Sequence, residues 1–343
     1  MSSVFVRGVG AVSPAGWGVA ALRRALHTQA PLPTTPVTRP GWNRPIPVRW
    51  VPAAEQRPPF LAHPRLRRAS ALTQHSLAAA LEALGEDVSL VRSGRLRLGL
   101  VVCLMPGCVT YSRRFYEEVV RDPALASPLL FPETVFNAPA SHLAAFLGSA
   151  APSYALVGDA SMFLAGLALA ANWLHQGRVD GCLVVGAEEL DWVVAHAVRL
   201  FERHSIQGAG AGALYLRPEA GGGAAPQLGC VTDPFSFQTA HARPAAARAM
   251  RTALRPDSPR ALLCLGTQGL ARPDRDELAA WADWNGDRVA PKRVLGEAFT
   301  AAAAWQCVAA CLALADGEYD AANVSVVGPN AQAIGARFVR PAQ

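Results

Sequence analysis

The chain has 343 residues, of which 51% are hydrophobic and 17% are charged, and its formal net charge is +6 at pH 7. This composition is typical of a well-buried α/β protein and excludes an intrinsically disordered chain. Charged or turn residues interrupt each long apolar stretch before it reaches membrane-spanning length, so we expect no membrane span. The N-terminal segment MSSVFVRGVG lacks the basic and then apolar pattern of a signal peptide, and we therefore expect a cytoplasmic protein.

Arginine carries nearly all of the positive charge, because Lys292 is the only lysine. That bias fits an acidic partner as well as a GC-rich genome. No basic run is interleaved with aromatic residues, so nucleic-acid binding is not predicted. The seven cysteines are scattered and form no CxxC pair, so neither a disulfide framework nor a metal site is predicted. Nothing in the sequence calls for a cofactor.

The N-terminal part of the chain alternates predicted strands and helices around a proline-rich segment. A strand at residues 3–7 precedes GVGAVSPAGWG, in which Gly8 and Gly10 lack the third glycine of a dinucleotide-binding loop. Residues 31–59 contain too many prolines for regular structure and predict a surface excursion. The other elements predicted before residue 150 are helices at 19–27, 64–86 and 111–121 and a strand at 97–104.

The stretch YALVGDASMFLAGLALAANWLHQGRVDGCLVVGAEE, residues 154–189, predicts a strand, a tight turn and a helix in that order. The apolar run at 154–157 predicts a buried strand, Gly158-Asp159 a turn, and 161–175 a helix of about four turns. Gly177 ends the helical pattern, and 182–185 predicts a second buried strand. In such an arrangement the residue at the turn points into a pocket, and the positive end of the helix dipole lies behind it.

The remaining chain repeats the alternation of strands and helices. Gly221-Gly222-Gly223 predicts a flexible joint, and we expect one half at 1–219 and a second at 220–343. No residue-level repeat links these halves, but the order of elements fits two βαβ-containing halves in one layered fold. The elements predicted here are strands at 208–219, 261–265 and 324–327 and helices at 274–284 and 298–315.

Landmarks at characteristic distances surround the turn at Gly158-Asp159. They are Gly177, Asp180 and Gly186-Ala187-Glu188 after the turn, LLFPETVFNAPASHLAAFLG before it and GVGAVSP near the N-terminus. Together they resemble the nucleophile elbow and the flanking segments of the β-ketoacyl synthases. The resemblance covers almost the whole chain, although the tract near 201–207 is shorter than in usual members. It implies an α/β thiolase-like fold with two halves in an α/β/α/β/α arrangement.

The catalytic positions of this family hold other residues here. A cysteine thiolate carries the acyl chain in these enzymes, and two histidines assist decarboxylation and stabilise the oxyanion. The family spacing puts the cysteine position at Ala160, the first histidine position at Leu265 within LGTQG, and the second at Glu297 within KRVLGE. The last histidine in the chain is His241, so neither C-terminal position has an imidazole. The loop VGPNA at 327–331 similarly resembles a family loop whose gating phenylalanine is replaced by Val327.

A ketosynthase fold without these residues is similar to the chain-length factors, or ketosynthase β subunits, of type II polyketide systems. Within this group, the sequence most resembles the subunits associated with aryl polyene pigment clusters. The resemblance implies a heterodimer with a catalytic ketosynthase, contact with an acyl carrier protein through that partner, and a share in the acyl tunnel of a polyketide or fatty-acid-like pathway. Residues that flank the elbow are candidates for the tunnel or interface, with core packing as the alternative: Phe136, Asn137, Met162 and Phe163.

Two other functions remain open from the residues alone. An acyltransferase or hydrolase on the same fold would use Ser161 or Glu297, although no matching histidine is visible to activate the serine and Glu297 has no visible partner. Capping of the helix by Asp159 or Ser161 is the simpler role. A self-associating scaffold is the other alternative. We expect His142 to serve packing and Lys292 to hold a carboxylate or a helix end.

Overall fold

The computed structural model describes residues 3–221, 225–255, 258–329 and 332–341. Within these residues the main feature is a sheet of 12 strands. Its strands are β1 (Phe5–Ser13), β5 (Leu98–Leu104), β6 (Ser153–Val157), β7 (Gly181–Glu188), β9 (Gly210–Arg217), β10 (Gln227–Val231), β12 (Ala261–Leu265), β13 (Arg288–Val289), β14 (Ala321–Val327) and β15 (Gln332–Val339), with β2 (Gly16–Trp17) and β11 (Phe235–Ser236) at the margins.

The two halves of this sheet have the same strand order. Outward from the centre the first half runs β1, β9, β7, β5, β6, and the second runs β10, β15, β14, β12, β13. The parallel pairs also correspond, because β5 pairs with β6 and β7, and β12 pairs with β13 and β14. The halves join where β1 and β10 pair antiparallel. This repeat of topology is invisible at the level of residues and agrees with the predicted pair of βαβ-containing halves.

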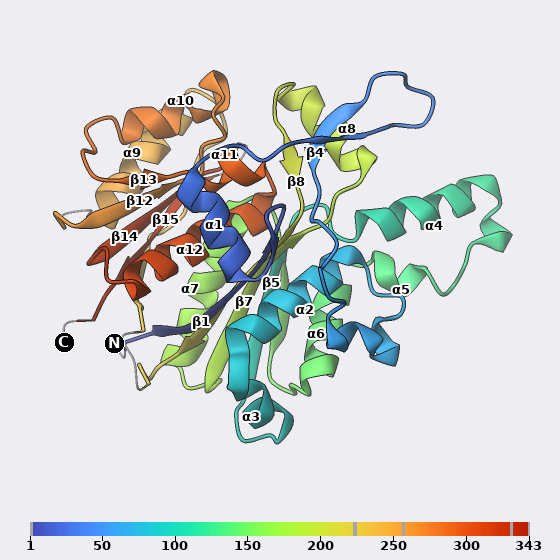
Figure 1. Cartoon of the computed structure of the whole chain (residues 1–343), viewed down its shortest axis with the longest axis horizontal. Helices are drawn as coiled ribbons and strands as arrows, with labels where there is room; N and C mark the ends of the chain where they lie inside the picture. Colours follow the sequence, from blue (N-terminus) through green and yellow to red (C-terminus); the bar gives the residue numbers. More distant parts are fainter. Residues whose placement is uncertain (1–2, 222–224, 256–257, 330–331, 342–343) are drawn as a thin grey trace.

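Helices form three layers around the half-sheets (Figure 1). The middle layer is α7 (Ser161–His175) and α12 (Phe299–Ala315), which contact each other and strands of both halves. The outer layers are α2 (Ala71–Leu84) with α6 (Ala138–Leu147) on one side and α9 (Arg243–Leu254) with α10 (Ala271–Ala280) on the other. The predicted α/β/α/β/α arrangement is confirmed. The remaining helices are α1 (Val19–Thr28), α3 (Val88–Arg92), α4 (Val109–Arg121), α5 (Phe131–Thr134), α8 (Trp192–Phe201) and α11 (Pro291–Leu295).

Small residues allow α12 to lie directly against the first half-sheet. A Cβ atom added to Gly212 would come within 2.7 Å of the Ala304 Cβ, and one added to Gly186 would lie 2.3 Å from the Thr300 carbonyl oxygen. Distances that short would force the helix away from the sheet. The alanine-rich sequence of α12 is thus explained by close packing in the centre of the molecule.

Most predicted elements occur close to their predicted positions, but two expectations were wrong. The strand at 154–157 was expected to be buried, whereas β6 is an edge strand whose Tyr154 and Val157 are each 48% exposed. Residues 31–59 were expected to be irregular, whereas they contain β3 (Thr35–Val37) and β4 (Ile46–Arg49), which form a small sheet with β8 (Gln207–Gly208). Pro36 fits there because β3 is at the edge of this sheet.

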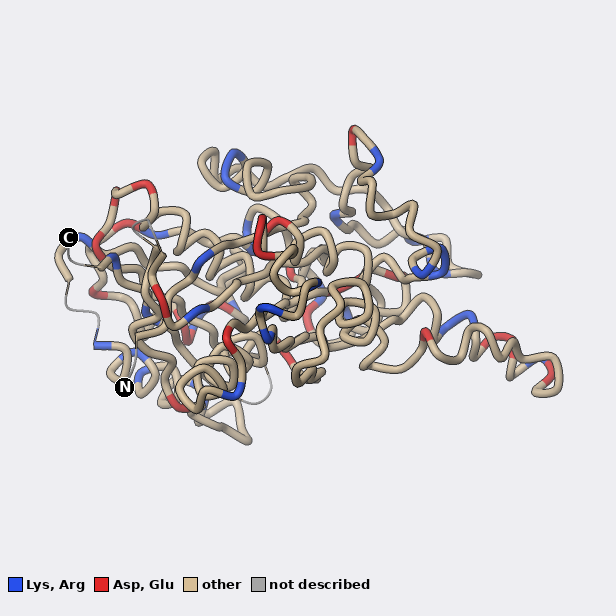
Figure 2. The backbone as a smooth tube through the Cα atoms, turned by 90° about the horizontal axis from the view of Figure 1, so that it is seen from below, with Lys and Arg blue, Asp and Glu red and all other residues tan. Residues whose placement is uncertain are grey.

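The helices α4 and α5 extend as an arm from the body of the molecule in both views (Figures 1 and 2). Figure 2 also shows basic and acidic residues interspersed along the chain rather than separated onto two faces. Among the described residues no helix combines the length and the hydrophobicity that crossing a membrane requires. The predicted joint at 221–223 and the loop end at 330–331 lie largely outside the described residues.

Candidate functional site

The elbow is formed as predicted but carries no nucleophile at its apex. After β6 the chain turns through Gly158 and Asp159, and α7 begins at Ser161. A Cβ at Gly158 would lie 2.4 Å from the Met162 Cγ, so a larger residue there would require the Met162 side chain to move. Ala160, where the family resemblance expects a cysteine, is 2% exposed. The local geometry that would support a thiolate is present, but the reactive atom is not.

Ser161, the nearest hydroxyl to the apex, is held in place on both sides. Its Oγ donates to the Asp159 Oδ1 and accepts from the Gln332 Nε2 at 2.7 Å. The Ser161 backbone N–H also donates to the Asp159 Oδ1 at 3.0 Å, so Asp159 caps the start of α7. The side chain is 1% exposed, and among the described residues no histidine hydrogen-bonds to it. Helix capping accounts for the contacts with Asp159, the contact with Gln332 ties the helix start to β15, and neither supplies an activating imidazole.

Leu265, where the resemblance expects the first histidine, ends β12 and is buried in an apolar cluster with Met250 and Trp281. The loop that follows is nevertheless kept in a defined shape. Asp274 accepts hydrogen bonds from the backbone N–H groups of residues 268, 269 and 270, at distances between 2.7 and 3.0 Å. The loop is thus fixed by Asp274, and an aliphatic side chain occupies the position where the family resemblance expects an imidazole.

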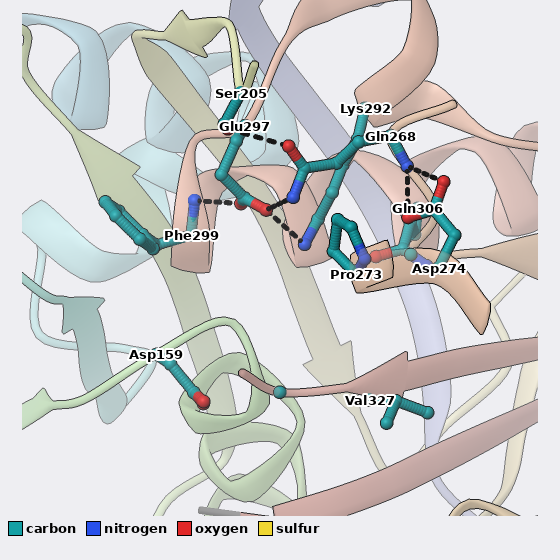
Figure 3. Close-up of polar contacts among 12 residues, drawn as sticks. Asp159, Ser205, Gln268, Pro273, Asp274, Lys292, Glu297, Phe299, Gln306 and Val327 are labelled. Atoms are coloured by element: carbon teal, nitrogen blue, oxygen red, sulfur yellow. Dashed lines mark hydrogen bonds and ion pairs between the residues drawn. The ribbon is translucent and has the colours of Figure 1, made fainter. Parts of the chain in front are cut away.

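Glu297, where the resemblance expects the second histidine, is the centre of a buried hydrogen-bond network (Figure 3). Its Oε2 accepts from the Lys292 Nζ at 2.8 Å and from the Gln268 Nε2 at 3.0 Å, and its Oε1 accepts from the Phe299 backbone N–H at 2.8 Å. The network continues through Ser205, whose Oγ donates to the Gln268 Oε1 at 2.7 Å. Both carboxylate oxygens are therefore engaged within the protein.

This arrangement corrects the expectation that Glu297 lacks a partner, and it confirms that Lys292 holds a carboxylate. Both side chains are nearly buried, with 7% of each residue exposed. Phe299 has a φ of 39°, which is unusual for a residue with a side chain, and its N–H bond to Glu297 helps to hold that conformation. A carboxylate fixed by a cation, an amide and a backbone N–H is poorly placed for proton transfer to a substrate.

The residues expected at the tunnel or interface fall into different environments. Phe136 is 45% exposed and contacts Gly107, Asn137 is exposed, and Met162 is half-buried beside Gly158. Phe163 is fully buried and packs against Gly186. For Phe163 these contacts are those of core packing, the alternative that the sequence left open, because its side of α7 faces the central sheet.

Two other predicted positions also acquire defined neighbours. The His142 Nε2 lies 2.9 and 3.1 Å from the two carboxylate oxygens of Glu133, on the short helix α5. Val327 is buried at the end of β14, and its carbonyl accepts from the Arg243 Nη2 at 3.2 Å. Sequence reasoning missed Gln268 and Ser205, which are 63 residues apart and have no shared pattern that would signal their contact.

The comparisons with known proteins agree with this architecture. No protein-family model matches the chain, and no curated protein matches it. Among solved structures it is similar to "The ishigamide ketosynthase/chain length factor", with a TM-score of 0.75, 22% identity and coverage of 99% of this chain and 100% of that one.

Two further structures are also similar. One is a type II polyketide synthase acyl-carrier protein in complex with its ketosynthase bound to the hexaketide, with a TM-score of 0.75, 15% identity and 99% coverage of both chains. The other is an oxazolomycin ketosynthase domain from Streptomyces albus JA3453, with a TM-score of 0.78, 15% identity and coverage of 100% of this chain and 74% of that one. The chain therefore has the ketosynthase form of the thiolase-like fold, with Ala160, Leu265 and Glu297 at the positions where the family resemblance expects cysteine, histidine and histidine.

Proposed function

We propose that this chain is a non-catalytic ketosynthase-fold subunit that pairs with a catalytic β-ketoacyl-acyl-carrier-protein synthase, in the manner of a chain-length factor. The proposal rests on the identity of the residues at the elbow and at the two positions expected to hold histidine. Ala160 cannot form an acyl thioester, Leu265 cannot transfer a proton, and Glu297 is already held by Lys292. Claisen condensation in this fold depends on all three missing groups.

An unpaired strand edge supports pairing with a second chain. Within the described residues β6 has β5 on one side and no strand on the other. Its Tyr154 and Val157 are each 48% exposed, and no charge interrupts SYALV. Soluble proteins usually protect such an edge, because unpaired N–H and C=O groups invite another strand. A partner that adds a strand here would satisfy both the backbone and the apolar side chains.

The projecting arm offers a second apolar surface. Tyr116 on α4 is 67% exposed, Leu125 after α4 is 74% exposed, and Phe131 on α5 is 56% exposed. Apolar side chains gathered on a projecting segment are typical of interaction sites. Together with β6, the arm supports an extensive interface rather than a small transient contact.

The absence of a thiol and imidazoles from this chain favours pairing with a different protein over pairing with a second copy. Two copies of this chain would bring together two sites without thiol or imidazole, whereas a catalytic ketosynthase would supply a complete set. One similar structure is described as a ketosynthase/chain length factor and another as a ketosynthase with its acyl-carrier protein, which supports this class of partner. In this proposal the acyl carrier protein is bound through the partner, and the complex is cytoplasmic.

The proposed role is to stabilise the partner and to limit the length of the growing chain. Phe136, Asn137 and Met162 flank the elbow without being fully buried, and we assign them to the tunnel or the interface. The sequence resemblance supports a role in a type II polyketide pathway and, more specifically, in one that makes an aryl polyene. A fatty-acid-like product fits the same mechanism.

Co-expression with the ketosynthase of its pathway, followed by purification through a tag on this chain, tests the proposal. We expect a one-to-one complex, and chain elongation from malonyl carrier protein only when both subunits are present. Val157→Lys on β6 should abolish co-purification, because it places a charge at the proposed strand pairing. Leu278→Lys is the matched control, since Leu278 on α10 is 41% exposed and lies on the opposite outer layer.

Two results would overturn the proposal. In the first, this chain is purified alone or only with itself, whatever ketosynthase is supplied. In the second, the isolated chain takes up an acyl group from an acyl carrier protein and loses that activity in Ser161→Ala.

A further inference from the structure

A small cavity lies beside the Glu297 network and is lined by an unusual number of cations. It lies where β4, α11, the segment before β8 and the loop after β12 meet, and its volume is about 190 Å³. Its lining residues are Pro31, Arg49, His204, Ile206, Gln268, Gly269, Leu270, Lys292 and Arg293. No carboxylate is among these residues.

Arg49 is the most informative member of this lining, because it is a guanidinium at 8% exposure. Its Nε donates to the Leu32 carbonyl oxygen at 2.8 Å, and its Nη1 donates to the Arg293 carbonyl oxygen at 3.4 Å. These contacts orient the side chain but leave other N–H groups of the guanidinium unused. In the part of the chain that the structure describes, no carboxylate forms an ion pair with Arg49.

The charge of the cavity is therefore only partly balanced. Lys292 is paired with Glu297 at 2.8 Å, whereas neither Arg49 nor Arg293 has an ion pair among the described residues. Burial lowers the pKa of Arg49, since the desolvated guanidinium has no anion nearby to offset the cost. A buried cation of this kind is stabilised by a bound anion.

We propose that this cavity is a binding site for a phosphate-sized oxyanion, held between the guanidinium groups of Arg49 and Arg293. Arginine forks match the geometry of phosphate oxygens and form charge-assisted hydrogen bonds with them. A water molecule occupies about 30 Å³ in the liquid, so the cavity holds one such anion with a few waters. The anion is either inorganic phosphate or the terminal group of a phosphomonoester. The site does not depend on the proposed pairing with a ketosynthase.

The test is calorimetric titration of the full-length protein with inorganic phosphate in a buffer without phosphate, at constant ionic strength set with sodium chloride. We expect saturable binding of one phosphate. Arg293→Gln should weaken it at least about tenfold, because a charge-assisted hydrogen bond is lost. The Arg293 side chain is exposed and makes no hydrogen bond or ion pair with the described residues, so this variant should keep its thermal stability. Arg49→Lys should weaken binding as well, since lysine lacks the fork.

The matched control is Arg248→Gln, in a separate basic hollow that Arg248, Arg251 and Arg255 line. This variant should bind phosphate like the unchanged protein. The proposal is overturned if phosphate shows no saturable binding beyond chloride, or if Arg248→Gln rather than Arg293→Gln removes it. Glycerol 3-phosphate distinguishes the two sources, because competition with phosphate shows that the cavity accepts an ester, and its failure to compete assigns the site to the free anion.

Discussion

The Lys292 ammonium lies 2.8 Å from the Glu297 carboxylate, and both residues are 7% exposed. They stand on either side of Gly296, whose φ of 94° allows the chain to turn between α11 and α12. A Cβ at Gly296 would lie 2.8 Å from the Ile206 carbonyl oxygen, so the turn and the ion pair depend on the same glycine. The position where a histidine is expected is thereby converted into a structural ion pair.

Lys292→Met should destabilise the protein by about 3–5 kcal/mol, because it leaves the Glu297 charge buried without its cation. The double variant Lys292→Met with Glu297→Gln should recover part of that loss, since the glutamine oxygen still accepts from the Phe299 N–H. Urea unfolding of the single and double variants measures the coupling free energy between Lys292 and Glu297. Equal stability of the single variant and the unchanged protein would contradict a stabilising pair.

Ser161→Ala should cost about 1–2 kcal/mol, because the Asp159 Oδ1 and the Gln332 Nε2 both lose their hydroxyl partner. In the purified complex with the ketosynthase, chain elongation should not change. Thermal unfolding and an elongation assay on the same preparations check both statements. Ser89→Ala, at an exposed position on α3, is the control for loss of a hydroxyl. Loss of elongation without loss of stability would instead support a catalytic serine.

His75 should make the protein sensitive to acid. It is 9% exposed, its Nδ1 has no hydrogen-bond partner among the described residues, and burial lowers its pKa from 6.5 to about 4. Because the unfolded chain binds the proton first, stability is lost as the pH falls from about 6.5 to about 4, by at most about 3 kcal/mol.

The variant His75→Gln should remove this part of the pH dependence. Urea unfolding between pH 7.5 and pH 4.5 should show a smaller decline in stability for the variant than for the unchanged protein. Parallel declines would mean that His75 is protonated equally in both states.

Glu277 should have the opposite effect on the alkaline side. Burial raises its pKa from 4.5 to about 7, and its Oε1 accepts from the Ser325 hydroxyl at 2.6 Å and from the Gly266 N–H at 3.0 Å. A folded-state pKa above the unfolded value means that the stabilising contribution is full below about 4.5 and is lost as the pH rises through about 7.

Glu277→Gln keeps the acceptor oxygen and removes the charge, so the variant should gain stability relative to the unchanged protein between pH 5 and pH 8. Melting temperatures across this range measure the difference. Glu86→Gln, at an exposed position, is the control and should show no such trend. A constant offset for Glu277→Gln at all pH values would contradict the raised pKa.

Local features of the sequence determined much of the fold, and the family resemblance implied the site positions. The predicted strand at 261–265 coincides with β12, and the helices predicted at 161–175 and 298–315 match α7 and α12 within one residue. Apolar periodicity and helix-ending residues act over a few neighbours, so they are visible without a structure. The absence of thiol and imidazole from the expected positions follows from residue identity alone.

Only the tertiary structure decided which side chains meet and which surfaces remain open. The apolar run at 154–157 is the same whether its strand is central or at an edge, and the topology leaves β6 at the edge. Phe163 is buried because α7 lies between the half-sheets. Gln268, Ser205 and Glu297 meet because three separate segments converge, and a local pattern has no information about such distant contacts. Composition and periodicity thus determined the elements, and the family resemblance implied the missing chemistry, whereas long-range packing decided the buried ion pair, the cationic cavity and the exposed edge.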